Sequence, residues 1–204
     1  MGLYRRFVLP RLIHLACRGE PTEGQRLKLV PLARGRVLEV GVGSGLNLPF
    51  YTGNVVKVWG LDPSAELLEM AGHTASDVPV EVELLRAGAE EIPLASASCD
   101  TVLVTYALCT IPDVVTALRE MRRVLAPGGR LLFCEHGLAP EGRVRRAQNW
   151  VNPVWKRIGG GCHLNRDIPS LIRQAGFELT SLETTYLPGW RPGSFNYRGT
   201  AVTP

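Results

Sequence analysis

Residues 37–47 read Val-Leu-Glu-Val-Gly-Val-Gly-Ser-Gly-Leu-Asn, a short apolar run that passes into three alternating glycines. The β-branched run is typical of a buried strand, and the glycines are typical of the turn that leads from such a strand into a helix. Glycine at positions 41, 43 and 45 lets the chain turn sharply and lets its backbone approach a bound ligand closely. The segment therefore predicts a site for a nucleotide-like cofactor at the end of a strand.

The next apolar run, residues 55–61, is followed directly by Asp62. A carboxylate at this place can accept hydrogen bonds from both hydroxyls of a ribose. The glycine spacing distinguishes between cofactors, because the dinucleotide fingerprint G-x-G-x-x-G needs a glycine where this chain has Leu46. Glu39 would repel a pyrophosphate but suits a cationic sulfonium that also carries an amino-acid ammonium group. The segment therefore favours such a cation over a nicotinamide dinucleotide.

Apolar runs alternate with helix-period segments along the rest of the chain. Strands are expected near residues 36–40, 55–61, 80–86, 101–105 and 130–135, as buried parallel strands, with two more near 177–186 and 195–203. Helices are expected over Ser64–Ala75 and Asp113–Leu125, the second ended by the Pro-Gly-Gly sequence at 127–129. The alternation predicts an α/β doubly wound sheet with helices on both faces, in a single domain covering residues 1–204.

The composition fits one ordinary globular domain, since the 204 residues are 45% hydrophobic and 21% charged, with a formal net charge of +4. This mild charge predicts no nucleic-acid partner, and the arginines within 143–146 are interpreted as a solvated helix face. The five cysteines form no CxxC pair, which favours reduced thiols and a cytoplasmic protein. Cys162 and His163 have no further ligand pair at a suitable spacing, so no metal site is expected.

Two segments interrupt the alternating pattern. Residues 1–34 are expected to form a helical cap over the mouth of the site, because Pro10 and Arg11 interrupt any signal-peptide core. No stable membrane insertion is expected, and the weaker alternative is contact of this N-terminal helix with a membrane surface. Residues 139–166 contain Trp150, Trp155 and a glycine run, and are interpreted as an active-site insertion or, alternatively, as a packing helix followed by a flexible turn.

Five motifs in order resemble those of the class I S-adenosylmethionine-dependent methyltransferases, and the resemblance covers nearly the whole chain. They are residues 38–45, 60–64, 87–93, 99–100 and 123–130. The resemblance implies a Rossmann-like methyltransferase fold, with a seven-stranded, mostly parallel sheet that contains one antiparallel strand. It also implies S-adenosyl-L-methionine as the cofactor.

The resemblance carries roles onto individual positions of the cofactor site. They are Glu39 near the amino group, Gly41, Gly43 and Gly45 along the methionine and ribose, Asp62 on the ribose hydroxyls, Pro63 beside the adenine, Gly88, Ala89 and Glu90 at the adenine amino group, and Thr105 under the cofactor. Many members carry aspartate at the position of Gly88. Here the Ala89 backbone and Glu90 are therefore expected to take more of the adenine recognition.

A narrower resemblance concerns the two ends of the chain. Tyr4, Pro10 and His14, residues 45–51, Trp155 and residues 161–166 are similar to the methyltransferase-like proteins that methylate alkyl thiols in animals, and to their bacterial relatives. The membrane-anchoring N-terminal segment of the animal proteins is not expected here. The resemblance implies a small-molecule methyl acceptor, a thiol before a hydroxyl or an amine.

Three residues are candidates for direct action on the acceptor. His136 and His163 could orient or deprotonate it, and Tyr106 follows the fourth strand beside the cofactor site. Each could equally be a packing residue. Because a free thiol has a pKa of about 8.5, a thiol acceptor needs less help from a base than a hydroxyl or an amine does.

Other functions stay open at this stage. A nicotinamide-dependent oxidoreductase is disfavoured by Leu46 and Glu39, and a protein that only binds the cofactor is a further alternative. Methyltransferases of base amino groups place a polar residue, two prolines and an aromatic after the fourth strand, where this chain has Thr-Tyr-Ala-Leu at 105–108. Lipid and quinone-like acceptors remain alternatives within the methyltransferases, and the sequence does not determine the oligomeric state.

Overall fold

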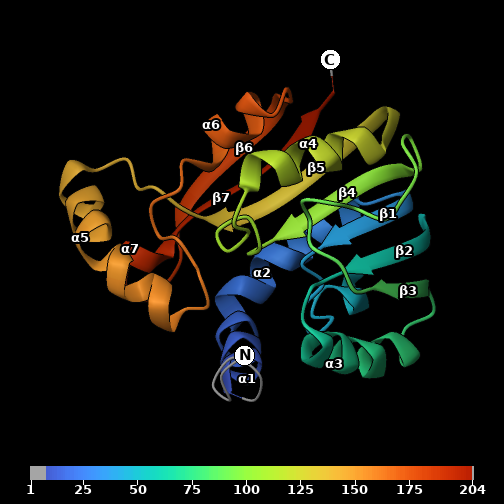
Figure 1. The fold of residues 1–204 in the computed structure, drawn as a ribbon, viewed down its shortest axis with the longest axis horizontal. Helices are drawn as coiled ribbons and strands as arrows, with labels where there is room; N and C mark the ends of the chain where they lie inside the picture. The colour runs from blue at the N-terminus through green and yellow to red at the C-terminus, as the bar shows by residue number, and fades with distance from the viewer. Residues whose placement is uncertain (1–7, 204) are drawn as a thin grey trace.

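A seven-stranded sheet forms the centre of residues 8–203, the part of the chain that the computed structural model describes (Figure 1). Its strands are β1 Gly35–Val40, β2 Val55–Leu61, β3 Glu81–Leu85, β4 Cys99–Thr105, β5 Leu125–His136, β6 Glu178–Tyr186 and β7 Phe195–Val202. The order across the sheet is β3-β2-β1-β4-β5-β7-β6. The first five strands pair in parallel, and β7 is antiparallel to both of its neighbours. The predicted mostly parallel sheet with one antiparallel strand is confirmed.

The helices of the described residues are α1 Leu9–Cys17, α2 Glu20–Leu29, α3 Ala65–Ser76, α4 Val114–Val124, α5 Gly142–Ile158, α6 Ile168–Gln174 and α7 Arg191–Ser194, with short 3-10 turns η2 Val30–Leu32 and η3 Leu48–Phe50. Two of the helices, α3 and α4, begin and end within one residue of the positions that the sequence predicts. Ser64 and Asp113, predicted as the first helical residues, are instead the N-caps of α3 and α4. Their side-chain oxygens accept hydrogen bonds from the backbone N–H groups of Leu67 and Thr116.

The fifth strand starts earlier than predicted. α4 ends at Val124, and Leu125 already pairs with Cys99 of β4. The register then shifts, and regular pairing resumes at Arg130 opposite Thr101. The Pro-Gly-Gly sequence at 127–129 therefore forms an irregularity inside β5, because proline and glycine are tolerated in a strand at such a bulge.

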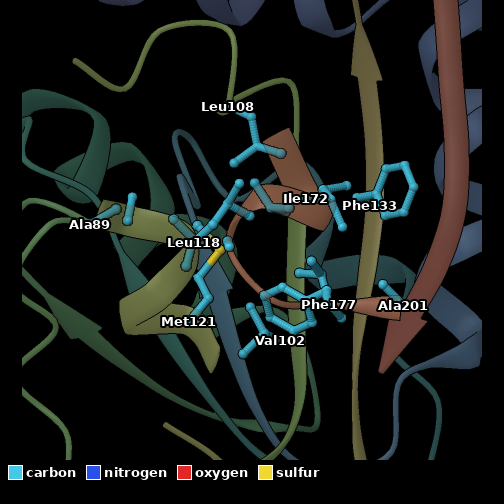
Figure 2. Packing of buried hydrophobic residues seen from close by; sticks show 14 of the residues in the cluster. Ala89, Val102, Leu108, Leu118, Met121, Phe133, Ile172, Phe177 and Ala201 are labelled. Atoms are coloured by element: carbon cyan, nitrogen blue, oxygen red, sulfur yellow. The ribbon is translucent and has the colours of Figure 1, made fainter. Parts of the chain in front are cut away.

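Helices cover both faces of the sheet, as predicted. One face packs Val102 and Phe133 of the strands against Leu118 and Met121 of α4 and Ile172 of α6 (Figure 2). The other face forms a second buried cluster in which strand residues such as Val37 and Leu103 meet Leu29 of α2. Because the carboxyl ends of parallel strands share one edge, the loops after β1, β2 and β4 emerge together there. Within the described residues, no helix is long and apolar enough to cross a membrane.

The described parts of the two segments that interrupt the alternating pattern, within residues 1–34 and 139–166, lie near the carboxyl edge of the sheet. α1 and α2 lie below the strand ends in Figure 1, and α5 extends beside α7 at the left of that view. Residues 1–7 and 204 lie outside the described part of the chain, so the structure says nothing of Tyr4 or of the first residues of the predicted cap.

Candidate active site

A cavity of about 490 Å³ opens at the carboxyl edge of the sheet. Its lining brings together most of the cofactor-binding residues that were predicted from separate parts of the sequence. They are Gly41, Gly43, Asp62, Pro63, Gly88, Ala89, Glu90 and Thr105, together with the candidate Tyr106. Glu39 and Gly45 do not line this cavity, and neither do His136 and His163.

The three glycines of the loop after β1 differ in what a side chain would contact at each position. All three have positive φ, at +72° for Gly41, +55° for Gly43 and +81° for Gly45, a region in which glycine is strongly favoured. A side chain on Gly41 would overlap that of Ala107, so this glycine lets the loop after β1 approach the turn after β4. A side chain on Gly45 would press against Ala71 of α3. A Cβ on Gly43 would find no protein atom closer than 3.9 Å, so the bare backbone of Gly43 faces the cavity.

Asp62 connects the glycine loop to the start of α3. Its Oδ2 accepts a hydrogen bond from the backbone N–H of Gly43 at 3.1 Å, and its Oδ1 accepts one from Ser64 at 2.9 Å. Burial raises the pKa of this carboxyl, while the two N–H groups act in the opposite direction. The carboxylate therefore stands at the cavity wall with backbone partners on both sides, and keeps lone pairs for a ligand with paired hydroxyls.

Glu39 lies behind the cavity wall rather than on it. The side chain is 1% exposed, and its carboxylate accepts hydrogen bonds from Asn47 Nδ2 at 2.9 Å and from the Tyr51 hydroxyl at 2.7 Å. Burial raises the pKa of Glu39 to about 7. Asn47, which lines the cavity, also donates to Thr105 Oγ1 at 2.9 Å. The acid therefore holds the polar groups that face the ligand and contributes negative charge at short range.

This buried acid makes folding stability depend on pH. Because the pKa of Glu39 is higher in the folded protein than in the unfolded chain, the stability that it contributes is complete at low pH and declines as the pH rises. Between about pH 5 and about pH 7, the free energy of unfolding of the wild type is expected to fall by about 2 kcal/mol more than that of Glu39→Gln. Urea unfolding of both proteins at a series of pH values measures this difference. Parallel pH profiles would contradict the buried, perturbed carboxyl.

The first two helices supply residues that the sequence analysis did not assign to the cofactor site. Leu9, Ile13 and His14 of α1 line the cavity, as does Arg26 of α2. His14 Nδ1 lies 2.7 Å from Ser44 Oγ in the glycine loop, and Arg26 Nε donates to Asn47 Oδ1 at 3.0 Å. Nothing local in the sequence marks these residues as ligands, because they reach the loop only through the tertiary fold.

The residues that the resemblance places near the adenine also line this cavity. Gly88 and Glu90 both line it, and a Cβ at Gly88 would come within 3.0 Å of Glu90 Oε2. The other oxygen of that carboxylate accepts a hydrogen bond from the backbone N–H of Asp113 at 3.2 Å. The Glu90 carboxylate therefore occupies the space that an aspartate side chain at position 88 would need.

The turn after β4 is fixed by a buried acid of β5 that the sequence analysis gave no role. Glu135 is fully buried, and its Oε1 accepts hydrogen bonds from the backbone N–H groups of Ala107 and Leu108 at 2.6 and 2.8 Å. Tyr106, at the start of this turn, has a φ of +54°, and burial raises the pKa of its phenol well above the usual value. The Cys134 thiol donates to the Tyr106 hydroxyl at 3.5 Å, so Tyr106 is held as a neutral phenol beside the cavity.

The two histidines predicted as candidates lie behind the cavity wall. His136 Nε2 is 3.1 Å from Cys162 Sγ, while the backbone N–H of His163 donates to the Cys109 carbonyl at 2.8 Å. Burial lowers the pKa of His163 to about 4, and the nearby Arg166 and Lys156 act in the same direction. The fold therefore brings Cys162 together with His136, which lies 26 residues away in the sequence, rather than with the adjacent His163.

Residues 139–166 form α5 and a glycine turn. Within the described part of this segment, Gly160 is the only residue that lines the cavity. The fully buried side chain of Gln148 bonds to backbone groups on several sides, and the ring of Trp155 lies 5.7 Å from that of Trp190 in the loop before α7. This arrangement is that of a packing helix followed by a turn that reaches the site, and the lid interpretation stays a prediction.

Comparisons with known proteins relate this chain to methyltransferases. The sequence profile of the family described as "Methyltransferase domain" matches residues 38–133. Thiol S-methyltransferase TMT1B of Homo sapiens is 33% identical over 177 residues, which cover 83% of this chain and 72% of the human protein. TMT1B of Rattus norvegicus is 33% identical over 165 residues, which cover 79% of this chain, and the match spans 65% of the length of the rat protein.

Solved structures share the fold at lower identity. Phospholethanolamine N-methyltransferase 2 of Haemonchus contortus superposes with a TM-score of 0.75 at 16% identity, over 99% of this chain and 60% of that one. A possible histamine N-methyltransferase from Thermotoga maritima superposes with a TM-score of 0.69 at 23% identity, over 98% of both chains. At these identities the likeness concerns the fold, and the identity to TMT1B carries the relationship.

Proposed function

This chain belongs to the class I S-adenosylmethionine-dependent methyltransferases, and we propose that it methylates the sulfur of a small, largely apolar thiol. S-adenosyl-L-methionine is the cofactor, and when bound it supplies an electrophilic methyl group on a positively charged sulfur. The relatives named thiol S-methyltransferases support the choice of acceptor. The observation that carries the proposal is the set of apolar side chains that line the cavity.

Several side chains and backbone groups around the cavity suit S-adenosyl-L-methionine. The Asp62 carboxylate is placed to accept hydrogen bonds from paired ribose hydroxyls, and the bare backbone of Gly43 leaves the space that the ligand needs. Arg26, His14 and Ser44 all line the cavity, and the guanidinium of Arg26 can bind the carboxylate of the methionine part. Glu39 lies behind the glycine loop, and in its ionised form it favours the cationic groups of the cofactor.

The cavity lining includes apolar side chains that we assign to the acceptor. They are Leu9 and Ile13 of α1, with Ile111 and Pro112 of the turn that follows β4. Burial of an apolar substituent contributes about 25 cal/mol for each Å² removed from water. Such a wall binds an alkyl or aryl thiol better than a strongly polar or charged acceptor. Tyr106 and Cys17 add two weakly polar groups to the same lining.

This site could catalyse the transfer by holding the donor and the acceptor in the reactive geometry. The displacement needs the acceptor atom, the methyl carbon and the donor sulfur nearly in line, and holding the reactants in that geometry contributes most of the rate. Glu135 fixes the backbone of Ala107 and Leu108, which keeps the wall next to the acceptor rigid. α1 excludes water from the same side. A thiol needs no strong base, since part of it is already thiolate at neutral pH.

The open side of Gly43 provides a test of the proposed cofactor position. In Gly43→Ala the new methyl group would stand where the ligand must lie, so the affinity for S-adenosylhomocysteine is expected to fall about tenfold. The positive φ adds a cost of about 1 kcal/mol, which lowers Tm by a few degrees. Calorimetric titration and thermal unfolding measure the two effects. Gly53→Ala, at an exposed position with nothing within 4 Å, is the matched control.

An acceptor panel tests the proposed function. The full chain is incubated with S-adenosylmethionine and with matched sets of alkyl and aryl thiols, alcohols and amines, and both products are measured by mass spectrometry. The expected result is S-adenosylhomocysteine and a methyl thioether in equal amounts, with the thiols at least about a hundredfold ahead in kcat/KM. Preferred methylation of a phospholipid amine, a quinone or a nucleic acid would overturn the thiol assignment. Cofactor binding without transfer to any acceptor in the panel would also count against it.

A further inference from the structure

Three soft donor atoms converge behind the wall of the cavity. They are Cys109 Sγ, His136 Nε2 and Cys162 Sγ, and all lie within 4.8 Å of one another. The residues come from the turn after β4, the last position of β5 and the turn after α5. Cys109 directly precedes Thr110, and Cys162 follows Gly160 by two positions, so the cluster adjoins two residues that line the cavity.

The spacing of the three atoms suits one tetrahedral metal ion. In such a site the sulfurs lie about 2.3 Å and the imidazole nitrogen about 2.0 Å from zinc, so ligand atoms are about 3.5–3.8 Å apart. His136 Nε2 and Cys162 Sγ are already 3.1 Å apart, and Cys109 lies close enough to complete the triangle. Only small side-chain movements are needed to place all three at bonding distance.

Hydrogen bonds within the protein do not account for the position of His136. Its Nε2 faces Cys162, and its buried Nδ1 has no hydrogen-bond partner among the described residues. The neighbouring Glu135 is fully buried, and its Oε2 is also without a partner in that part of the chain. Buried polar groups in this condition cost free energy. A cation bound at Nε2 leaves Nδ1 as it is, but it would interact favourably with the buried Glu135 carboxylate nearby.

We propose that Cys109, His136 and Cys162 bind a Zn²⁺ ion, with a water molecule as the fourth ligand. Two thiolates and an imidazole are the donor set that zinc prefers over magnesium or calcium, which take oxygen ligands. Binding releases the two thiol protons to solvent as the two Zn–S bonds form, and no oxidation is involved. The ion would join three separate segments at one point. It would thereby fix the wall formed by Thr110 and Gly160, a role independent of which acceptor the enzyme uses.

Metal analysis of the intact protein tests the site directly. The chain is purified under reducing conditions, incubated with ZnSO₄, dialysed against metal-free buffer and measured by elemental mass spectrometry, with one zinc per chain as the expected result. Replacement by Co²⁺ is expected to give the charge-transfer absorption of cobalt thiolates. Cys162→Ser and His136→Gln are expected to weaken zinc binding at least about a hundredfold. His136→Cys restores a ligand and is expected to keep the zinc.

Cys99→Ser is the matched control, because Cys99 is a buried cysteine at the opposite end of β4. It is expected to leave zinc and cobalt binding unchanged. Circular dichroism and the affinity for S-adenosylhomocysteine check that each variant is folded. Three results would overturn the proposal: a reduced wild-type protein that binds no zinc, zinc that is retained equally in Cys162→Ser, and a disulfide between Cys109 and Cys162 in the protein as purified from reducing cytoplasm.

Discussion

Asp62→Ala is expected to weaken the binding of S-adenosylhomocysteine about a hundredfold. Hydrogen bonds to a charged group contribute about 1.5–3 kcal/mol each, and the carboxylate can accept two from the ribose, so a net loss of about 2.7 kcal/mol is a conservative figure. The same side chain also holds the backbone N–H groups of Gly43 and Ser64, which loosen in its absence. Isothermal titration calorimetry measures the affinity.

An analogue of S-adenosylhomocysteine that lacks both ribose hydroxyls makes this test specific. Its affinity for the wild type is expected to be low, and Asp62→Ala is expected to reduce it little further, because the interaction is already absent. Asp77→Ala removes an exposed aspartate at the C-terminal end of α3 and serves as the control. Equal affinity of wild type and Asp62→Ala for S-adenosylhomocysteine would mean that the ribose lies elsewhere.

Gln148→Ala is expected to destabilise the protein by about 3–5 kcal/mol. The fully buried Nε2 of this side chain donates to the carbonyls of Gly137, Leu164 and Pro192 at 2.9–3.0 Å, and its Oε1 accepts from the N–H of Ala139. The substitution removes the partner of the buried groups of Gly137, Ala139 and Leu164 and of the part-buried Pro192 carbonyl, and a backbone group costs about 1–3 kcal/mol when it is left unpaired and water cannot reach it. It also leaves a cavity that adds to the loss.

Urea unfolding of the two proteins measures this change in the free energy of unfolding. Gln174→Ala, which removes an exposed glutamine at the end of α6, is expected to change it by less than about 0.5 kcal/mol. A loss below about 1 kcal/mol in Gln148→Ala would show that water or a shifted backbone satisfies the four groups. The glutamine would then not be the link that attaches α5 to β5 and to α7.

The sequence predicts those parts of the molecule that depend on local patterns. Runs of apolar residues predict each strand, and the caps at Ser64 and Asp113 bring the predicted helix boundaries within one residue of the observed ones. The glycine loop and Asp62 are predicted together because a strand, a tight turn and the next strand lie close in sequence. The resemblance implies the seven-stranded sheet with one antiparallel strand, which no local pattern contains.

The rest of the site depends on contacts between segments far apart in sequence. Arg26 reaches Asn47, and Glu135 reaches Ala107, only because the sheet brings their strands and helices together. Glu39 was expected near the cofactor's amino group, yet Asn47 and Tyr51 occupy its carboxylate, a competition that spacing alone does not reveal. Cys162 lies beside His136 rather than His163 for the same reason, because the tertiary fold and not the sequence spacing brings the two side chains together.

One further consequence follows from the position of α1. His14 of this helix contacts Ser44 of the glycine loop, and Leu9 and Ile13 line the same cavity. One short helix therefore contributes to the walls that both ligands would meet. If binding of the donor changes the affinity for the acceptor, thermodynamic linkage makes the effect reciprocal and equal in size.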